Sequence, residues 1–142
     1  TNDGIGISGH DFEGNLILGT PSQGNSRFGF PERKRSYYGA FHQDAIWTKK
    51  GGPYLIRDNL VVLQNNTFLI EPGTIIKFIT NSNAKILVKG TLEAIGEADD
   101  QIIFTSNYEE KGLAGPGNWS FIDFTGPDSI LENVVVKYGG WW

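Results

Sequence analysis

The sequence predicts an all-β fold, a β-solenoid of about three coils preceded by a glycine-rich N-terminal arm. The main observation is a phrase that occurs twice. Residues 69–75 (LIEPGTI) are echoed by residues 87–92 (LVKGTL), with the Gly-Thr corner repeated seventeen residues later. Each copy has an apolar strand, a charged residue, a tight corner and a second apolar strand. Recurrence of one corner with the same flanks is typical of a solenoid, in which each repeat buries its apolar face against its neighbours.

Composition supports an all-β chain with many short strands. The chain has 142 residues, 39% of them apolar, with nineteen glycines and nine phenylalanines. Glycine at the corners, with aromatic and β-branched residues between them, is typical of an all-β chain. No apolar period of 3.6 residues continues for three helical turns, so no long helix is expected. Asn-Gly and Asp-Gly hairpin turns are absent from residues 60–105, which argues against a sheet of hairpins.

Residues 1–46 form the predicted arm, whose pattern of apolar residues and glycines differs from that of the rest of the chain. Residues 14–18 (GNLIL) predict one strand, whereas the residues before them are extended but too glycine-rich to predict another. Residues 37–41 (YYGAF) hold three aromatic side chains, each of which buries roughly 150–250 Å² when packed. We expect this cluster to dock the arm onto the first coil.

Residues 47–142 form the predicted coils, with residues 47–56 (WTKKGGPYLI) as the entry. Each coil has three strands, expected at 60–63, 67–70 and 74–79, then 84–88, 91–95 and 101–105, then 120–124, 129–131 and 133–138. A polar insertion, residues 106–118, separates the second coil from the third.

Three strands per coil, parallel from coil to coil, predict a triangular prism with strands about 4.8 Å apart. Gly73 and Gly90 are expected at corners where a Cβ would clash or where φ is positive, and Pro72 fixes φ at the bend before Gly73. The residues expected to point inward and stack are Ile75, Phe78, Ile102, Phe104, Val134 and Val136.

These segments resemble a known family. WTKKGGPYLI, TFLIEPGTIIKF, ILVKGTLEAIG, QIIFTS and LENVVVKYGG are similar to the opening coils of right-handed parallel β-helix domains of the pectate-lyase-like superfamily, in the form found on secreted and surface-anchored bacterial proteins. The resemblance covers roughly residues 46–140 and implies a right-handed helix and an extracellular or cell-surface location. It indicates the fold rather than an activity, and residues 1–36 resemble no family that we can name.

If the chain were an enzyme of that superfamily, the resemblance implies one of two arrangements. Lyases use acidic clusters on adjacent coils to hold calcium, with an Arg or Lys as base, whereas hydrolases use close Asp pairs as general acid and base. The available carboxylates are Asp99 and Asp100 in a turn, and Asp123 and Asp128 in the third coil. Asp123 alternates with Ile122 and Phe124 and so points outward. The Gly-His-Gly and Arg-Ile-Lys phrases of the hydrolases are absent, and three coils are too few for a polysaccharide groove. The sequence therefore assigns no catalytic residue and favours a non-catalytic module over an enzyme.

The alternative is a carbohydrate-active or carbohydrate-binding domain of a polysaccharide-degrading protein. In that case Tyr37, Tyr38, Trp119 and Trp141 would stack on sugar rings. We favour a place for these aromatic side chains in the core and at the junctions.

Metal and cofactor sites are not predicted. The chain has no cysteine, and its two histidines, His10 and His42, are too far from other ligands for a zinc site. Three carboxylates near the N-terminus could supply oxygen ligands for calcium, but they lack the spacing of a calcium loop. They are Asp3, Asp11 and Glu13.

Charge and hydropathy argue against two classes of partner, nucleic acid and a spanned membrane. A net charge of −4 and a pI of about 5.1 do not favour nucleic acid, which needs a basic face. No apolar run approaches the ~20 residues of a membrane span. Two Asn-x-Ser/Thr sequons occur, at Asn65 and Asn118, and they matter only in a secretory pathway that glycosylates. Asn65 and Asn66 also suit a corner, because asparagine tolerates left-handed φ.

The functional hypothesis depends on the last predicted strand, residues 133–138. The last strand is as apolar as an interior one, and no helix or polar loop follows to cap it. The coils either continue in a longer β-helix or are covered by a second copy, stacked head to tail through the strand at 14–18. The predicted function is an extracellular structural or adhesive module, with end-to-end assembly into a filament. The predicted assembly residues are Leu16, Ile17, Leu18, Val134, Val136, Tyr138, Trp141 and Trp142.

Overall fold

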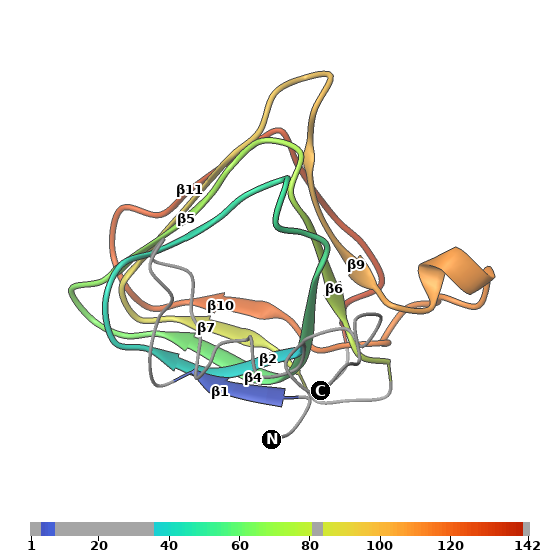
Figure 1. Ribbon diagram of the computed structural model, residues 1–142, viewed down its shortest axis with the longest axis horizontal. Coiled ribbons are helices and arrows are strands. Elements are labelled where there is room, and N and C mark those ends of the chain that lie inside the picture. The colour runs from blue at the N-terminus through green and yellow to red at the C-terminus, as the bar shows by residue number, and fades with distance from the viewer. Residues whose placement is uncertain (1–3, 8–35, 81–83, 141–142) are drawn as a thin grey trace, which may run out of the picture.

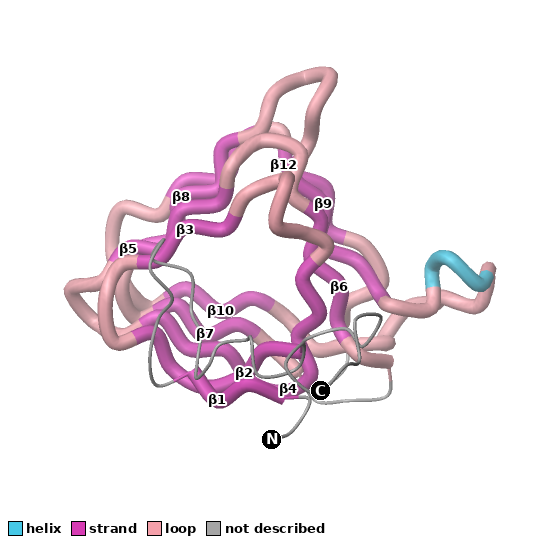
Figure 2. Tube along the Cα trace, viewed as in Figure 1, coloured by secondary structure: helices cyan, strands magenta, loops and turns pink. Residues whose placement is uncertain are grey.

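The structure, a computed structural model, is a parallel β-solenoid, and it describes residues 4–7, 36–80 and 84–140. Every strand pair in its two sheets is parallel. Viewed down the short axis, the coils have a triangular outline with strands on three sides and loops at the corners (Figures 1 and 2). The predicted all-β, all-parallel fold is confirmed.

Each coil contributes one strand segment to each side. The first side consists of residues 39–41 of β2 (Ser36–Phe41), residues 60–62 of β4 (Tyr54–Val62), β7 (Ile86–Val88) and β10 (Ile122–Phe124). The second consists of β3 (Ala45–Trp47), β5 (Thr67–Ile70), β8 (Thr91–Ile95) and β11 (Ile130–Glu132). The third consists of residues 54–56 of β4, β6 (Ile75–Phe78), β9 (Ile102–Ser106) and β12 (Val134–Val136).

The core is built from columns of side chains that stack from coil to coil. Alternation along each strand, visible in β5 and β6, points every second residue inward. The registers place these inward residues one above another. Among these columns are Phe41–Val62–Val88–Phe124, Leu60–Ile86–Ile122, Trp47–Ile70–Ala94–Leu131 and Tyr54–Ile76–Phe104–Val136.

Aromatic rings concentrate in the first coils. The ring of Trp47 stacks on Tyr54, with centroids 4.1 Å apart and planes 3° apart. It also meets Phe68 edge-on at 4.9 Å, in geometries that aromatic pairs favour. The hydroxyl of Tyr54 accepts a hydrogen bond from the Thr48 N–H at 3.0 Å. This polar group thus finds a partner at the edge of the core.

The described chain has one more coil than the sequence predicted. Residues 39–56, which include the end of the predicted arm, form a coil whose strands pair with those of the next. The coil is hard to see in the sequence because its corner at 48–53 differs in sequence from the equivalent corners at 71–74 and 96–101. Before it, β1 (Gly4–Ile7) pairs with β2, where the glycines had argued against a strand.

Two details of the sequence prediction are wrong. Ile75 does not point inward, because it pairs with Ile103, whereas Ile76 pairs with the buried Phe104. The repeated phrase also marks two different corners. Gly73 lies between β5 and β6, but Gly90 lies between β7 and β8. The true repeat is longer, as the pairing of Leu60 with Ile86 shows.

Candidate functional site at the open end of the solenoid

The last coil has an apolar inner face with no further coil above it in the described part of the chain. Phe124, Leu131 and Val136 come from its three sides and are 39%, 42% and 51% exposed. The residues beneath them in the ladders are fully buried. These are Val88, Ala94 and Phe104. These last-layer side chains are therefore exposed because no described coil covers them, and not because their residue types are more polar than those below.

A hollow of about 430 Å³ opens between these side chains. Trp119, Ile122 and Tyr138 complete most of its wall, and Ser120 is the one hydroxyl-bearing aliphatic side chain there. Small-molecule sites are also mostly apolar, but they include a few precisely placed polar groups that orient the ligand. This wall is mainly apolar, so the surface suits the packing of further apolar side chains better than a polar ligand.

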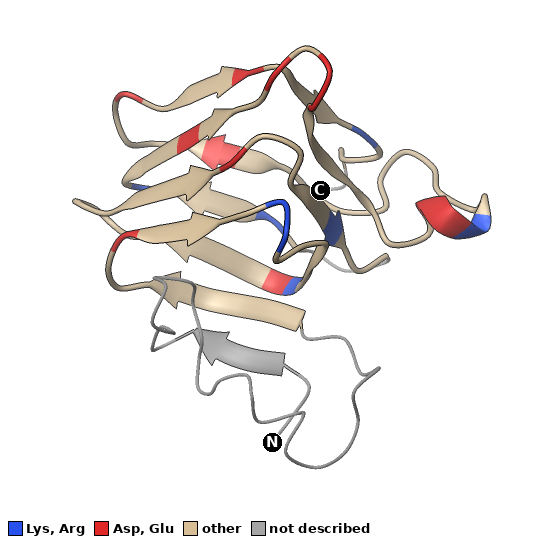
Figure 3. Ribbon diagram, turned by 45° about the horizontal axis from the view of Figure 1, so that its top comes forward, with Lys and Arg blue, Asp and Glu red and all other residues tan. Residues whose placement is uncertain are grey.

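The strands around the hollow are edge strands. β10, β11 and β12 are each the last strand of their ladder. One row of backbone N–H and C=O groups in each therefore has no further strand to pair with among the described residues. Such an edge can accept another strand. The apolar layer and the unpaired edges lie at the same end of the stack, and the layered arrangement is visible in Figure 3.

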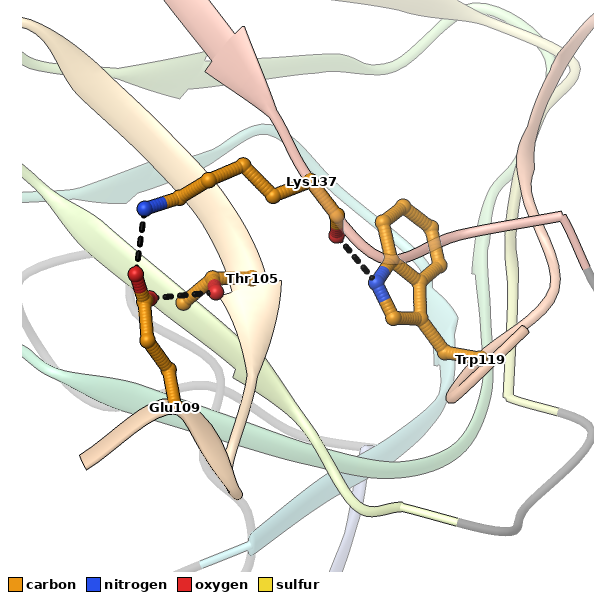
Figure 4. Close-up of polar contacts among 4 residues, drawn as sticks. All are labelled: Thr105, Glu109, Trp119 and Lys137. Atoms are coloured by element: carbon orange, nitrogen blue, oxygen red, sulfur yellow. Dashed lines mark hydrogen bonds and ion pairs between the residues drawn. The ribbon is translucent and has the colours of Figure 1, made fainter. Parts of the chain in front are cut away.

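Trp119 packs this end of the stack against β6, which belongs to a coil two turns earlier. Its ring is buried and stacks on Phe78, with centroids 3.8 Å apart and planes 3° apart. Its indole N–H donates to the carbonyl oxygen of Lys137 at 2.8 Å, at the end of β12 (Figure 4). The indole therefore satisfies its polar group while it fills the core.

Asn133 makes the corner between β11 and β12. Its φ of 51° is left-handed, a conformation that asparagine adopts more readily than most residues. Its side-chain amide donates to the Gly96 carbonyl oxygen at 3.2 Å, and its own carbonyl accepts from the Ile102 N–H at 3.1 Å. These bonds hold the last coil in register with the second-to-last.

The insertion at 106–118 is tied to the outer surface of the third side. It contains the 3-10 helix η1 (Glu109–Lys111). The Thr105 hydroxyl donates to one carboxylate oxygen of Glu109 at 2.6 Å, and Lys137 donates to the other (Figure 4). The Lys137 ammonium, followed by the Thr105 hydroxyl, holds the pKa of Glu109 below its ordinary value of 4.5. A second ion pair joins Lys77 to Glu110.

Gly73 lies under an ion pair that crosses the corners. It has a φ of +81°, and a Cβ there would come within 2.6 Å of Lys49 and 2.5 Å of Asp100. The Lys49 ammonium donates to Asp100 at 2.8 Å. Hydrogen bonding and charge attraction to Asp100 raise the pKa of Lys49 above its ordinary value. Asp100, one of the candidate catalytic carboxylates, is thus an ion-pair partner.

Gly90 is needed for close packing between coils. A Cβ there would lie 2.3 Å from the Asn66 carbonyl oxygen and 2.4 Å from that of Leu63. Gly126, one coil later, has the same relation to the Gly90 carbonyl oxygen at 2.2 Å. Asn65 in this column of corners has a φ of 70°, in keeping with the expected tolerance of asparagine.

The structure brings together some of the predicted assembly residues. Val136 and Tyr138 line the hollow, and Val134 lies half-buried above Ile102. Leu16, Ile17, Leu18, Trp141 and Trp142 lie outside the described residues. Sequence reasoning missed Phe124 and Leu131, which complete the face. Extending the column of Val88 and that of Ala94 by one coil would have found both.

The remaining candidates that the structure describes do not gather into a catalytic or metal site. Asp123 and Asp128 are exposed, as is His42, while His10, Asp3, Asp11 and Glu13 lie outside the described residues. Within residues 4–7, 36–80 and 84–140, no three His, Cys, Asp or Glu side chains are placed to hold a metal ion. Of the aromatics considered for sugar stacking, Tyr37 and Trp119 are buried.

No helix in the described ranges is both long and apolar enough to cross a membrane. No protein-family profile matches the chain, and no solved structure matches it significantly. The chain is similar to Protein bark beetle of Drosophila melanogaster, with 33% identity over 116 residues. The match covers 73% of this chain but spans only 3% of the fly protein.

Proposed function

We propose that this chain is a non-catalytic, extracellular structural or adhesive module that assembles end to end, with the open face of one copy covered by the first layers of the next. The observation that carries the proposal is the uncovered layer of Phe124, Leu131 and Val136 beside three unpaired strand edges. Burying apolar area of this kind stabilises a contact by roughly 25 cal/mol per Å².

Strand direction supports head-to-tail stacking. β1 is the edge strand at the opposite end of the largest sheet, and it runs parallel to every other strand of that sheet. A second copy placed in the same orientation continues the parallel ladder, whereas an inverted copy would present antiparallel strands. A contact between different ends does not close on itself and so generates a filament.

The proposed extracellular location is based on the similarity of this chain to other proteins. The resemblance of the coils to β-helix domains of secreted and surface-anchored proteins supports an extracellular place for this chain. The small share of the fly protein that the match covers supports a module used within long chains. In such a chain, a following coil of the same polypeptide would occupy the open face in place of a second copy.

A pair of substitutions in β11 tests the assembly. Leu131 points into the hollow, whereas Ile130 next to it points outward, and both are exposed to nearly the same extent, at 42% and 40%. We expect Leu131→Lys to raise the concentration needed for assembly at least roughly a hundredfold, because burying an unpaired ammonium costs several kcal/mol. Ile130→Lys should leave assembly unchanged.

Sedimentation velocity over a wide concentration range, with electron microscopy of the same samples, provides the measurement. Elongated oligomers of the unmodified chain and of Ile130→Lys, together with a monomeric Leu131→Lys, would support the proposal. A wild-type chain that stays monomeric at every concentration would overturn self-assembly and point to a coil of a longer chain. Equal assembly of both variants would overturn the role of this face.

A further inference from the structure

The two glycosylation sequons lie in different surroundings. Asn65 is exposed in the turn between β4 and β5, at a corner away from the insertion (Figure 1). The hydrogen bond that fixes this corner comes from its neighbour, because the Asn66 side-chain amide donates to the Phe41 carbonyl oxygen at 3.1 Å. The side chain of Asn65 can therefore carry a large group without loss of that bond.

Asn118 is held within the fold. It is half-buried, its side-chain oxygen accepts from the Gly115 N–H at 3.0 Å, and its backbone N–H donates to the Tyr138 carbonyl oxygen at 2.9 Å. The next two residues of the sequon, Trp119 and Ser120, are buried. Both also line the hollow at the open end. A glycan on Asn118 would thus stand beside the face that stacking requires.

We propose that Asn65 carries an N-linked glycan and that Asn118 remains unmodified. The inference rests on the extracellular location in the proposed function, because only a glycosylating secretory pathway supplies the donor. That donor is an oligosaccharide linked to a lipid pyrophosphate. The Asn65 amide nitrogen attacks the anomeric carbon, a C–N bond forms, the C–O bond to the pyrophosphate breaks, and the amide gives up one proton.

The position of Asn65 is compatible with end-to-end stacking. The corner of Asn65 lies below that of Gly90, which in turn lies below that of Gly126 in the last coil. Two strand spacings, about 10 Å, therefore separate this corner from the open layer. A hydrophilic glycan projecting from the side would hinder lateral contacts between copies while the ends stay accessible.

Substitutions of the hydroxyl residues test the assignment without altering either asparagine. Thr67→Val destroys the first sequon, and Val is nearly the same size and suits the start of β5. Thr67→Ser keeps the sequon and is the matched control. The Thr67 backbone N–H, which donates to Asp44 at 2.8 Å, is preserved in both. Ser120→Ala removes the second sequon.

Each chain is secreted from cultured animal cells behind a cleavable leader, and its mass is measured before and after treatment with a peptide N-glycosidase. We expect one glycan on the unmodified chain, on Thr67→Ser and on Ser120→Ala, and complete loss on Thr67→Val. A secreted chain without a glycan, or a glycan that survives Thr67→Val and disappears in Ser120→Ala, would overturn the proposal. The stacking test uses unglycosylated protein from bacteria, so its outcome stands apart from this one.

Discussion

The first and last described coils contain similar side chains in very different states. Phe41 and Trp47 in the first are completely buried, whereas Phe124 and Leu131 occupy the equivalent columns in the last and are 39% and 42% exposed. β1 pairs with residues 36–39 of β2 beyond the first coil, whereas β10, β11 and β12 have no further strand in the described chain; β3, which carries Trp47, is also the last strand of its ladder. The two ends of the stack therefore differ in how well their inner side chains are covered, and composition alone does not decide this burial.

The largest effect that tests this difference in burial is expected from a matched pair of truncations, one of a buried ring and one of a partly exposed ring. Phe104→Ala removes a fully buried ring in β9, and we expect it to lower the free energy of unfolding by about 3–5 kcal/mol. Phe124→Ala removes a ring that packs on one side, and about 1–2 kcal/mol is expected from its smaller buried area. Urea denaturation of dilute, monomeric protein measures both. Equal losses would mean that the last coil is covered after all.

Corner packing provides a second contrast. Gly90→Ala forces a Cβ against two backbone carbonyl oxygens, so we expect a loss of about 2–3 kcal/mol in unfolding free energy. Gly115→Ala, in the insertion, places a Cβ where no atom lies within 4 Å, and its effect should be within about 0.5 kcal/mol. Thermal and urea unfolding of the two variants give the comparison. A tolerated Gly90→Ala would contradict the close stacking of corners.

The smallest expected effect concerns the insertion that joins the last two coils. Because the pKa of Glu109 is lowered in the folded state, its contribution is complete above the ordinary value of 4.5 and is lost as pH falls through the lowered value. Glu109→Gln should therefore cost about 1 kcal/mol or less near pH 7 and a smaller amount near pH 3. A stability difference that does not change between these two pH values would contradict the ion pair with Lys137.

Much of the fold could be predicted because the pattern is local. Strands with alternating or continuous apolar residues were located in the last three coils to within a few residues, and the insertion was placed correctly. The coil at 39–56 could be recognised only at its end, residues 47–56, since its corner differs in sequence from the equivalent corners at 71–74 and 96–101. The error at Ile75 has a simple origin: two residues three apart, such as Ile75 and Phe78, cannot both face inward in a regular strand.

The candidate site was harder to predict than the fold. Val136 was found because the last strand is continuously apolar, but Phe124 and Leu131 sit in short strands beside charged residues. Alternation around Asp123 indicates that Phe124 faces inward, but the place of Phe124 and Leu131 in one exposed layer depends on their register with Val88 and Ala94 in the coil below. The contact of Glu109 with Lys137 likewise joins residues whose proximity arises from the coiling, whereas Thr105 lies only four residues from Glu109 in the sequence.

Hydrogen exchange of the terminal strands tests the central claim most directly. The amides of β10, β11 and β12 that point toward the open side are compared with those of β7, β8 and β9, in dilute and in concentrated solution. We predict fast exchange in the dilute sample and at least roughly tenfold slower exchange in the concentrated one, with the interior strands protected in both. Exchange at the terminal strands that is the same at both concentrations would contradict an open face that a second copy covers.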